Sequence, residues 1–397
     1  MKTSRVISAK NTLLFLLLLA LVLSAGLTWA IHRVMQGNTP GMDFYIFWLA
    51  GRAALTGGNP YGDDIGVAVQ LGTYDHLSGA GQNQMLFAYP PYALLAVLPF
   101  LALPFDWAQA AWLSVNLIAL AATYLALKPV SPLRSIAGGL LFFPVAFALI
   151  LGNFVVLIGA ILLLVLTSMI QARQHSPAGW VALGILLAWT TIKPQFSWLF
   201  LAFIAVWVLR SRTWHLAWGF LGGLVTMLAL SFVVVPDWLS LWLGVLQKYT
   251  TYHPAEPALA TFLNAWLPHG AAQPLTIVII AVIAALTLIL FRRWWQGRET
   301  PLRLLAWLGL AAYLLAPQSV SYEQVRFLLP LFLWAAMLPA QNRWQLWIFF
   351  WGGLLVSWGV FVIERTNISF ALNSGWRLLY HLGWLIWLFW PFNRRKS

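Results

Sequence analysis

Apolar runs separated by short polar segments make up most of this chain. Thirteen such runs can be delimited, and many have the length that a helix needs to cross about 30 Å of hydrocarbon. Only 8% of the residues are charged, whereas a soluble domain has roughly 25%. Because backbone groups in lipid must be hydrogen-bonded internally, these runs are expected to be helices. The sequence therefore predicts an all-α, polytopic membrane protein that forms a single integral domain over residues 1–397.

Basic residues near both termini predict the side of the membrane on which the ends lie. Three of the first ten residues and three of the last four are Lys or Arg, and cytoplasmic segments are enriched in these residues. With both ends in the cytoplasm the number of crossings is even, so one of the thirteen runs fails to cross. The candidates are 89–103, which contains Pro99, and 133–151, which Pro144 interrupts. We therefore expect about twelve crossings of the plasma (inner) membrane, with extracytoplasmic loops at 33–88 and 236–271.

The composition excludes several other classes of function. The formal net charge of +13 is spread over short loops, where topology and anionic lipids explain it, so no nucleic-acid partner is expected. The absence of Cys excludes disulfides and thiolate nucleophiles. There is no Walker-type loop, dinucleotide fingerprint or HExxH motif. Nine of the ten acidic residues fall on or near the predicted outer side, which indicates a working surface that faces outward.

Asp43 is the first acidic residue of the sequence and follows the first apolar run. Pro40 and Gly41 break the chain before it, and apolar residues then recur at helical spacing as far as Leu55. This pattern predicts a helix that lies on the outer membrane surface. Asp43 could simply cap that helix, since Asp is among the best N-cap residues, or it could be catalytic.

Further polar side chains fall in the expected outer loops and at the outer ends of spans. Lys193 lies between two apolar runs, where a charge is expensive and usually functional, although a Lys can also extend its side chain to the interface. Glu323 and Arg326 have the spacing of an ion pair on one helical turn, and a substrate contact is the alternative. The pairs Asp63-Asp64 and Asp75-His76 match no metal-ligand pattern and are expected to be solvated. The candidates for substrate binding are Tyr45, Arg52, Tyr89, Lys193, Gln195, His253, Tyr322, Glu323 and Arg326.

Four motifs follow one another along the chain. They are Asp43 and Tyr45 with Gly58-Asn59-Pro60-Tyr61; Tyr89-Pro90-Pro91; Gly152-Asn153 followed by Lys193-Pro194; and residues 319–324 before Arg326-Phe327-Leu328-Leu329-Pro330. In this order the set resembles the GT-C class of membrane glycosyltransferases, and most closely glycosyltransferase family 87. The chain departs from the family where Asn153 stands in place of a frequent Gln, and where Glu323 stands in place of a common Asp.

The resemblance implies a GT-C-like fold and a polyprenyl-phosphate-sugar-dependent glycosyltransferase of the cell envelope, similar to the mannosyltransferases. Such an enzyme would pass mannose, or another hexose or pentose, to a lipid or glycan acceptor outside the membrane. Asp43 would be the general base of an inverting reaction. Lys193 and Arg326 would face the lipid phosphate as it leaves. We expect no cofactor, no obligatory metal, and a monomer whose other partners are membrane lipids.

Two other classes of function compete with this interpretation. A transporter or flippase for lipid-linked sugars would share a basic groove, but it often shows internal repeats and polar residues at mid-membrane. No convincing repeat is present, and the polar residues gather on one side. A structural scaffold would lack a focused polar pocket.

Overall fold

The computed structural model describes residues 9–36, 41–79, 81–126, 139–171, 175–252, 257–317 and 321–329, with a few separate positions between 351 and 383. All regular structure in these ranges is helical, and they contain no β-strand. An isolated bridge joins Pro257 and Pro317. The predicted all-α class is therefore confirmed.

The N-terminal half of the described chain contains one long helix followed by shorter ones. These are α1 (Ala9–Met35), α2 (Met42–Leu55), α3 (Asp63–Tyr74), α4 (Ala93–Val97), the 3-10 helix η1 (Leu98–Phe100), α5 (Phe105–Ala126), α7 (Phe143–Leu151) and α8 (Val155–Ile170).

The second half begins with α9 (Pro177–Ala188) and continues to the short helix η3. Its elements are η2 (Trp189–Ile192), α10 (Pro194–Ser211), α11 (Trp214–Val234), α12 (Trp238–Tyr252), α13 (Ala258–Trp266), α14 (His269–Trp295), α15 (Pro301–Leu315) and η3 (Ser321–Phe327).

Five of the described helices are long and apolar enough to cross a membrane. They contain the segments Leu18–Met35, Phe105–Leu125, Pro194–Ser211, Trp214–Val234 and Gly270–Trp295. Shorter apolar helices lie at Val155–Ile170, Pro177–Ile192 and Pro301–Leu315. The chain is thus a multi-pass membrane protein. The count of about twelve crossings stays a prediction, because the expected spans 344–363 and 376–391 lie almost wholly outside the described residues.

Runs 89–103 and 133–151, the two candidates for the segment that does not cross the membrane, both contain short helices. Run 89–103 contains α4, of five residues, and η1, of three. At 1.5 Å per residue neither can cross about 30 Å, so this run does not span the membrane as a helix. Run 133–151 contains α7, of nine residues, and much of its remainder lies outside the described part of the chain.

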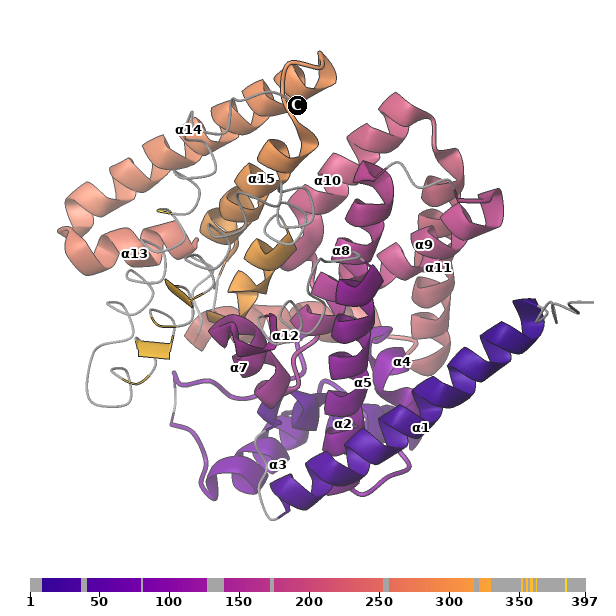
Figure 1. Ribbon diagram of the computed structural model, residues 1–397. Helices are drawn as coiled ribbons and strands as arrows, with labels where there is room; N and C mark the ends of the chain where they lie inside the picture. Colours follow the sequence, from indigo (N-terminus) through magenta and orange to yellow (C-terminus); the bar gives the residue numbers. More distant parts are fainter. Residues whose placement is uncertain are drawn as a thin grey trace, which may run out of the picture.

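The centre of the molecule is built from α8 and α15, which are buried along most of their length. The apolar windows of α1 and α14 are in contrast only 6% and 11% buried inside the protein. Figure 1 shows these two helices along opposite edges of the molecule. Exposed apolar helices at the rim are what a lipid environment favours.

Both predicted outer loops contain helices. Loop 33–88 contains α2 and α3, which lie close together in the lower part of Figure 1. Loop 236–271 contains α12 and α13, so it is not a simple polar connection. The helix expected after Asp43 is present, but it begins at Met42.

Candidate active site

Asp43 lies in the first turn of α2 and is held by an asparagine from another part of the chain. The Asn153 side-chain amide donates a hydrogen bond of 2.7 Å to Asp43 Oδ2. The N-cap of α2 is Gly41, and no side chain caps the helix. The interpretation of Asp43 as the helix cap is therefore wrong, because its carboxylate faces Asn153 instead of the first backbone amides.

The turn between α7 and α8 brings Asn153 to this position. Gly152 ends α7 with φ +70°, a conformation that side chains other than glycine rarely adopt. A Cβ atom at Gly152 would lie 2.6 Å from the Cβ of Phe44, so the turn can approach α2 only without a side chain. Its carbonyl accepts a 2.8 Å hydrogen bond from Trp112 Nε1. The Gly-Asn motif therefore positions the residue that contacts Asp43.

The Tyr-Pro-Pro motif is fixed beside the same turn. The Tyr61 hydroxyl donates to the carbonyl of Tyr89 at 2.9 Å. The Tyr92 hydroxyl donates to the carbonyl of Thr191 at 3.0 Å, two residues before Lys193. The Asn153 side chain also lowers the pKa of the nearby Tyr89 hydroxyl, which burial raises. Motifs separated by more than a hundred residues thus meet at Asp43.

Lys193, Glu323 and Arg326 form a buried cluster of charges. Lys193 Nζ lies 2.9 Å from Glu323 Oε1, and Arg326 Nη2 lies 2.7 Å from Glu323 Oε2. The three residues are 4%, 1% and 0% exposed. The two cations meet on a carboxylate of the protein, and their expected contact with a lipid phosphate stays a prediction. Arg326 lies over the Phe196 ring, 4.8 Å from its centroid, so it is enclosed by side chains of the protein.

Asp43 and this cluster share one electrostatic environment. Burial raises the pKa of Asp43 above its ordinary value, whereas the Asn153 hydrogen bond and the positive charge of Lys193 lower it. Burial also raises the pKa of Tyr249 to about 12, and the charges of Asp43 and Lys193 act on this phenol. The pKa values of Tyr89 and Tyr322 are raised by burial too. At neutral pH the phenols are therefore uncharged and can donate hydrogen bonds.

The model of glycosyltransferase family 87 matches residues 87–317. This range is more than half of the chain and includes Tyr89, Asn153, Lys193 and Tyr249. The chain belongs to glycosyltransferase family 87. No curated protein and no solved structure matches it.

Three other predicted site residues of this family 87 glycosyltransferase lie in α2 and α10. Tyr45 packs against Phe105, with 4.3 Å between the ring centroids, so it supports α2 from another side. Arg52 is exposed and lies over the Trp48 ring at 4.6 Å. Gln195 is half-buried in the first turn of α10.

The structure places Tyr322, the next predicted site residue, in η3. Tyr322 belongs to the cluster, because Lys193 Nζ lies 4.7 Å from the centroid of its ring. The predicted residue His253 lies outside the described residues.

Two residues of the family 87 site were not predicted as site residues. Asn153 was noted only as a motif position, although an amide between two apolar runs is itself a signal of a polar contact at depth. Tyr249 belongs to the predicted outer loop 236–271, and no sequence pattern separates it from the neighbouring tyrosine, Tyr252. Only the fold of α12 brings its ring towards Asp43.

The described residues contain no group of three His, Asp or Glu side chains that could hold a metal ion. The charges around Asp43 come from two carboxylates and two cations, which sum to zero. Glu323 is paired with both cations, whereas Asp43 is hydrogen-bonded to Asn153.

Proposed function

We propose that this family 87 glycosyltransferase transfers a sugar from a polyprenyl-phosphate donor to a lipid or glycan acceptor at the extracytoplasmic face of the membrane. The observation that carries the proposal is the placement of Asp43. Its side chain is half-buried and hydrogen-bonded to Asn153, and it lies within electrostatic reach of the buried Lys193. A carboxylate can accept the proton of the acceptor hydroxyl, and a fixed cation near it can stabilise the departing phosphate.

Asp43 acts as the general base in this proposal. The acceptor hydroxyl oxygen attacks the anomeric carbon of the donor, and its proton passes to the Asp43 carboxylate. The bond from the anomeric carbon to the phosphate oxygen breaks at the same time, and its electron pair leaves with the lipid phosphate. One carboxylate acting as a base without a covalent step inverts the anomeric configuration.

Lys193 stabilises the departing lipid phosphate. Negative charge grows on the phosphate in the transition state, and a fixed cation in a site of low dielectric stabilises that charge. Arg326 is fully buried behind Glu323, so it acts as a positioning residue for Glu323 and, through it, for Lys193. The proposed reaction requires no metal ion and no cofactor.

The distribution of charge along α10 supports an extracytoplasmic site. Lys193 precedes the first residue of α10, whereas Arg210 lies in its last turn. Arg210 Nη1 donates a 2.7 Å hydrogen bond to the carbonyl of Trp294, near the basic end of α14. The proposed active site and the cluster of basic residues are therefore at opposite ends of the bundle. If the basic end is cytoplasmic, the site faces outward.

Sugar transfer by the purified full-length protein tests the proposal. The protein would be reconstituted in liposomes with radiolabelled polyprenyl-phosphate mannose and an extract of membrane lipids and glycans. We expect labelled product with an inverted anomeric configuration. Movement of the labelled donor across the bilayer without transfer to any acceptor would contradict the proposal and favour a transporter.

A further inference from the structure

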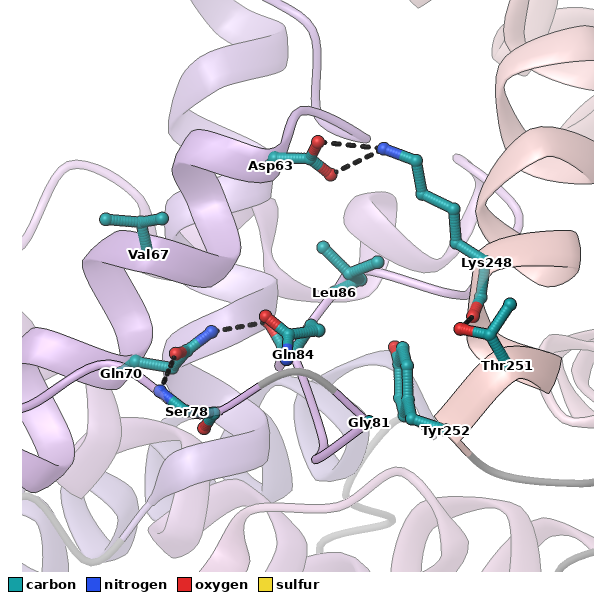
Figure 2. A pocket seen from close by; sticks show the side chains of 10 residues that line it. All are labelled: Asp63, Val67, Gln70, Ser78, Gly81, Gln84, Leu86, Lys248, Thr251 and Tyr252. Carbon is teal, nitrogen blue, oxygen red and sulfur yellow. Dashed lines mark hydrogen bonds and ion pairs between the residues drawn. The ribbon is translucent and has the colours of Figure 1, made fainter.

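A cavity of about 390 Å³ opens between α3 and α12. Figure 2 shows side chains from both helices and from the segment after α3 pointing into it. Its size falls within the range of small-molecule sites. The lining residues used below are Asp63, Gln70, Gln84, Leu86, Lys248 and Tyr252.

One wall of the cavity is held in place by a buried glutamine. The Gln70 side-chain amide donates to the carbonyl of Gln84 at 3.0 Å, and its oxygen accepts from the Ser78 backbone amide at 2.6 Å. Gln70 is 2% exposed. These two bonds fasten the segment after α3 to the helix itself, so the wall is formed before any ligand binds.

An ion pair links the two helices at the exposed side of the cavity. Lys248 Nζ lies 2.8 Å from each oxygen of Asp63, and the two side chains are 57% and 66% exposed. Both groups can exchange this surface contact for hydrogen bonds to a ligand, because exposed ion pairs contribute little stability. Their charges cancel, so the cavity does not select a charged ligand.

The other lining groups complete a site suited to a neutral, hydroxyl-rich molecule. Amides and hydroxyls supply donors and acceptors, and Tyr252 and Leu86 supply apolar surface. Ring hydroxyls require such donors and acceptors, and the C–H face of a sugar ring packs on aromatic surface. The Lys193 cluster near Asp43 contains cations suited to phosphate instead. The two places therefore suit different parts of the substrates.

Two segments that line the cavity, α12 and the segment that leads to Tyr89, also carry residues of the proposed active site. The Tyr252 ring lies beside that of Tyr249, with 5.1 Å between centroids, and Tyr249 lies within electrostatic range of Asp43. Leu86 precedes the segment of Tyr89, and Trp242 Nε1 of α12 donates to the carbonyl of Ala88 at 3.1 Å. A ligand in the cavity would thus contact Tyr252 and Leu86, which belong to the two segments that carry Tyr249 and Tyr89.

We propose that this cavity binds the sugar headgroup of a neutral glycan acceptor, with Asp63 and Lys248 as hydrogen-bonding residues that determine acceptor specificity. The inference rests on the proposed function, because it assigns the second substrate of that reaction.

Acceptor kinetics test this assignment. The probe is octyl α-mannoside, with polyprenyl-phosphate mannose as donor and the full chain in lipid nanodiscs. The variant D63N/K248Q keeps the net charge of the cavity at zero and loses the charged hydrogen-bonding groups. We expect the KM for the octyl mannoside to rise by about 10- to 100-fold, as for the loss of charge-assisted hydrogen bonds, with an unchanged KM for the donor.

D64N is the matched control, because Asp64 is an exposed neighbour outside the lining of the cavity. An unchanged acceptor KM in the double variant, or an equal change in D64N, would overturn the assignment.

Photolabelling separates this assignment from the proposed function. A diazirine derivative of octyl α-mannoside should label residues 63–86 or 248–252 in the wild-type protein, and free octyl mannoside should compete. D63N/K248Q should reduce the label about tenfold or more. A diazirine probe with the octyl chain but no sugar should give no such label. This pattern of labelling would support the cavity assignment even if the wild-type protein transferred no sugar from polyprenyl phosphate. The absence of transfer would count against the proposed reaction alone. Label elsewhere, or label that the free mannoside does not displace, would overturn the cavity assignment.

Discussion

The Asn153 amide donates its 2.7 Å hydrogen bond to Asp43 across 110 residues of sequence. Gly152 makes this contact possible, because its φ of +70° and its missing side chain let the α7–α8 turn approach α2. The bond favours the ionised form of a carboxylate whose burial favours the protonated form. The protonation state of Asp43 is therefore set by a balance between solvent exclusion, one amide and one lysine.

Asp43→Asn should abolish transfer without weakening the fold. The variant keeps the size of the side chain and can still accept the amide hydrogen of Asn153, but it cannot accept a proton from the acceptor. Loss of a general base typically costs about 10²–10⁴-fold in rate. Partial burial of the ionised carboxylate destabilises the folded state at neutral pH, so the melting temperature should stay the same or rise. Transfer assays and thermal unfolding in detergent measure both effects, and near-normal transfer would remove Asp43 from the mechanism.

As the pH decreases, the rate of transfer should begin to fall at a higher pH than it would with a base that has the ordinary pKa of Asp. A general base works when deprotonated, and burial raises the pKa of Asp43. For the same reason the folded state binds this proton more tightly than the unfolded state. The contribution of Asp43 to stability is therefore fully present below the ordinary carboxyl pKa and is lost as the pH rises through the raised value. A pH profile of kcat/KM checks the position of the acid limb.

Asn153→Ala should move that acid limb to still higher pH. The substitution removes the hydrogen bond that lowers the pKa of Asp43. Asn116→Ala is the control, because Asn116 is also buried and donates to the carbonyl of Trp112. Both variants should lose stability, and only Asn153→Ala should shift the pH profile. Equal profiles for the two variants would show that Asn153 has a structural role alone.

Lys193→Gln should impair use of the donor by the folded protein, and it should also lower stability because Glu323 keeps one cation in place of two. A leaving lipid phosphate needs positive charge close by, and the Lys193 ammonium is the cation that acts on Asp43. Steady-state kinetics with varied donor should show a lower kcat/KM, while kinetics with varied acceptor keep an unchanged acceptor KM. Arg303→Gln is the control, because Arg303 pairs with Glu299 at the basic end of the bundle. A wild-type kcat/KM for Lys193→Gln would contradict the assignment.

Arg326→Met should destabilise the protein strongly. Arg326 is fully buried and shares Glu323 with Lys193, so its removal leaves a buried carboxylate with one cation in place of two. Breaking a buried ion pair typically costs about 3–5 kcal/mol. Denaturant unfolding in micelles measures the loss, and Arg326→Lys should recover part of it. A loss below about 1 kcal/mol, the scale of exposed pairs, would mean that the cluster contributes little to the fold.

Labelling of introduced cysteines tests the orientation of the site. The chain has no native Cys, so each substitution gives one reactive position. Gly79→Cys lies on the side of the cavity, and Gln296→Cys lies at the basic end of α14. An impermeant thiol reagent should label the first in intact cells and the second only after lysis. The reverse pattern would place the proposed active site in the cytoplasm.

The sequence by itself predicted the class of fold, most helices and the residues that carry charge at the site. Long apolar runs are decisive because a backbone in lipid has no alternative to the helix. The helix after Asp43 was predicted from the helical spacing of its apolar residues, although it begins one residue earlier than predicted. Lys193 was identified because a charge between apolar runs is rarely without function.

Tertiary structure alone decided what those charged residues contact. The sequence could not show that Lys193 and Arg326 meet on Glu323, since three buried charges are placed by the packing of η2, α10 and η3. It could not show that Asp43 faces Asn153, because that depends on the close approach of two helices at Gly152. Nor could it separate Tyr249 from its neighbours. Periodicity is a local property that determines helices, whereas a site depends on distances between helices, which long-range packing fixes.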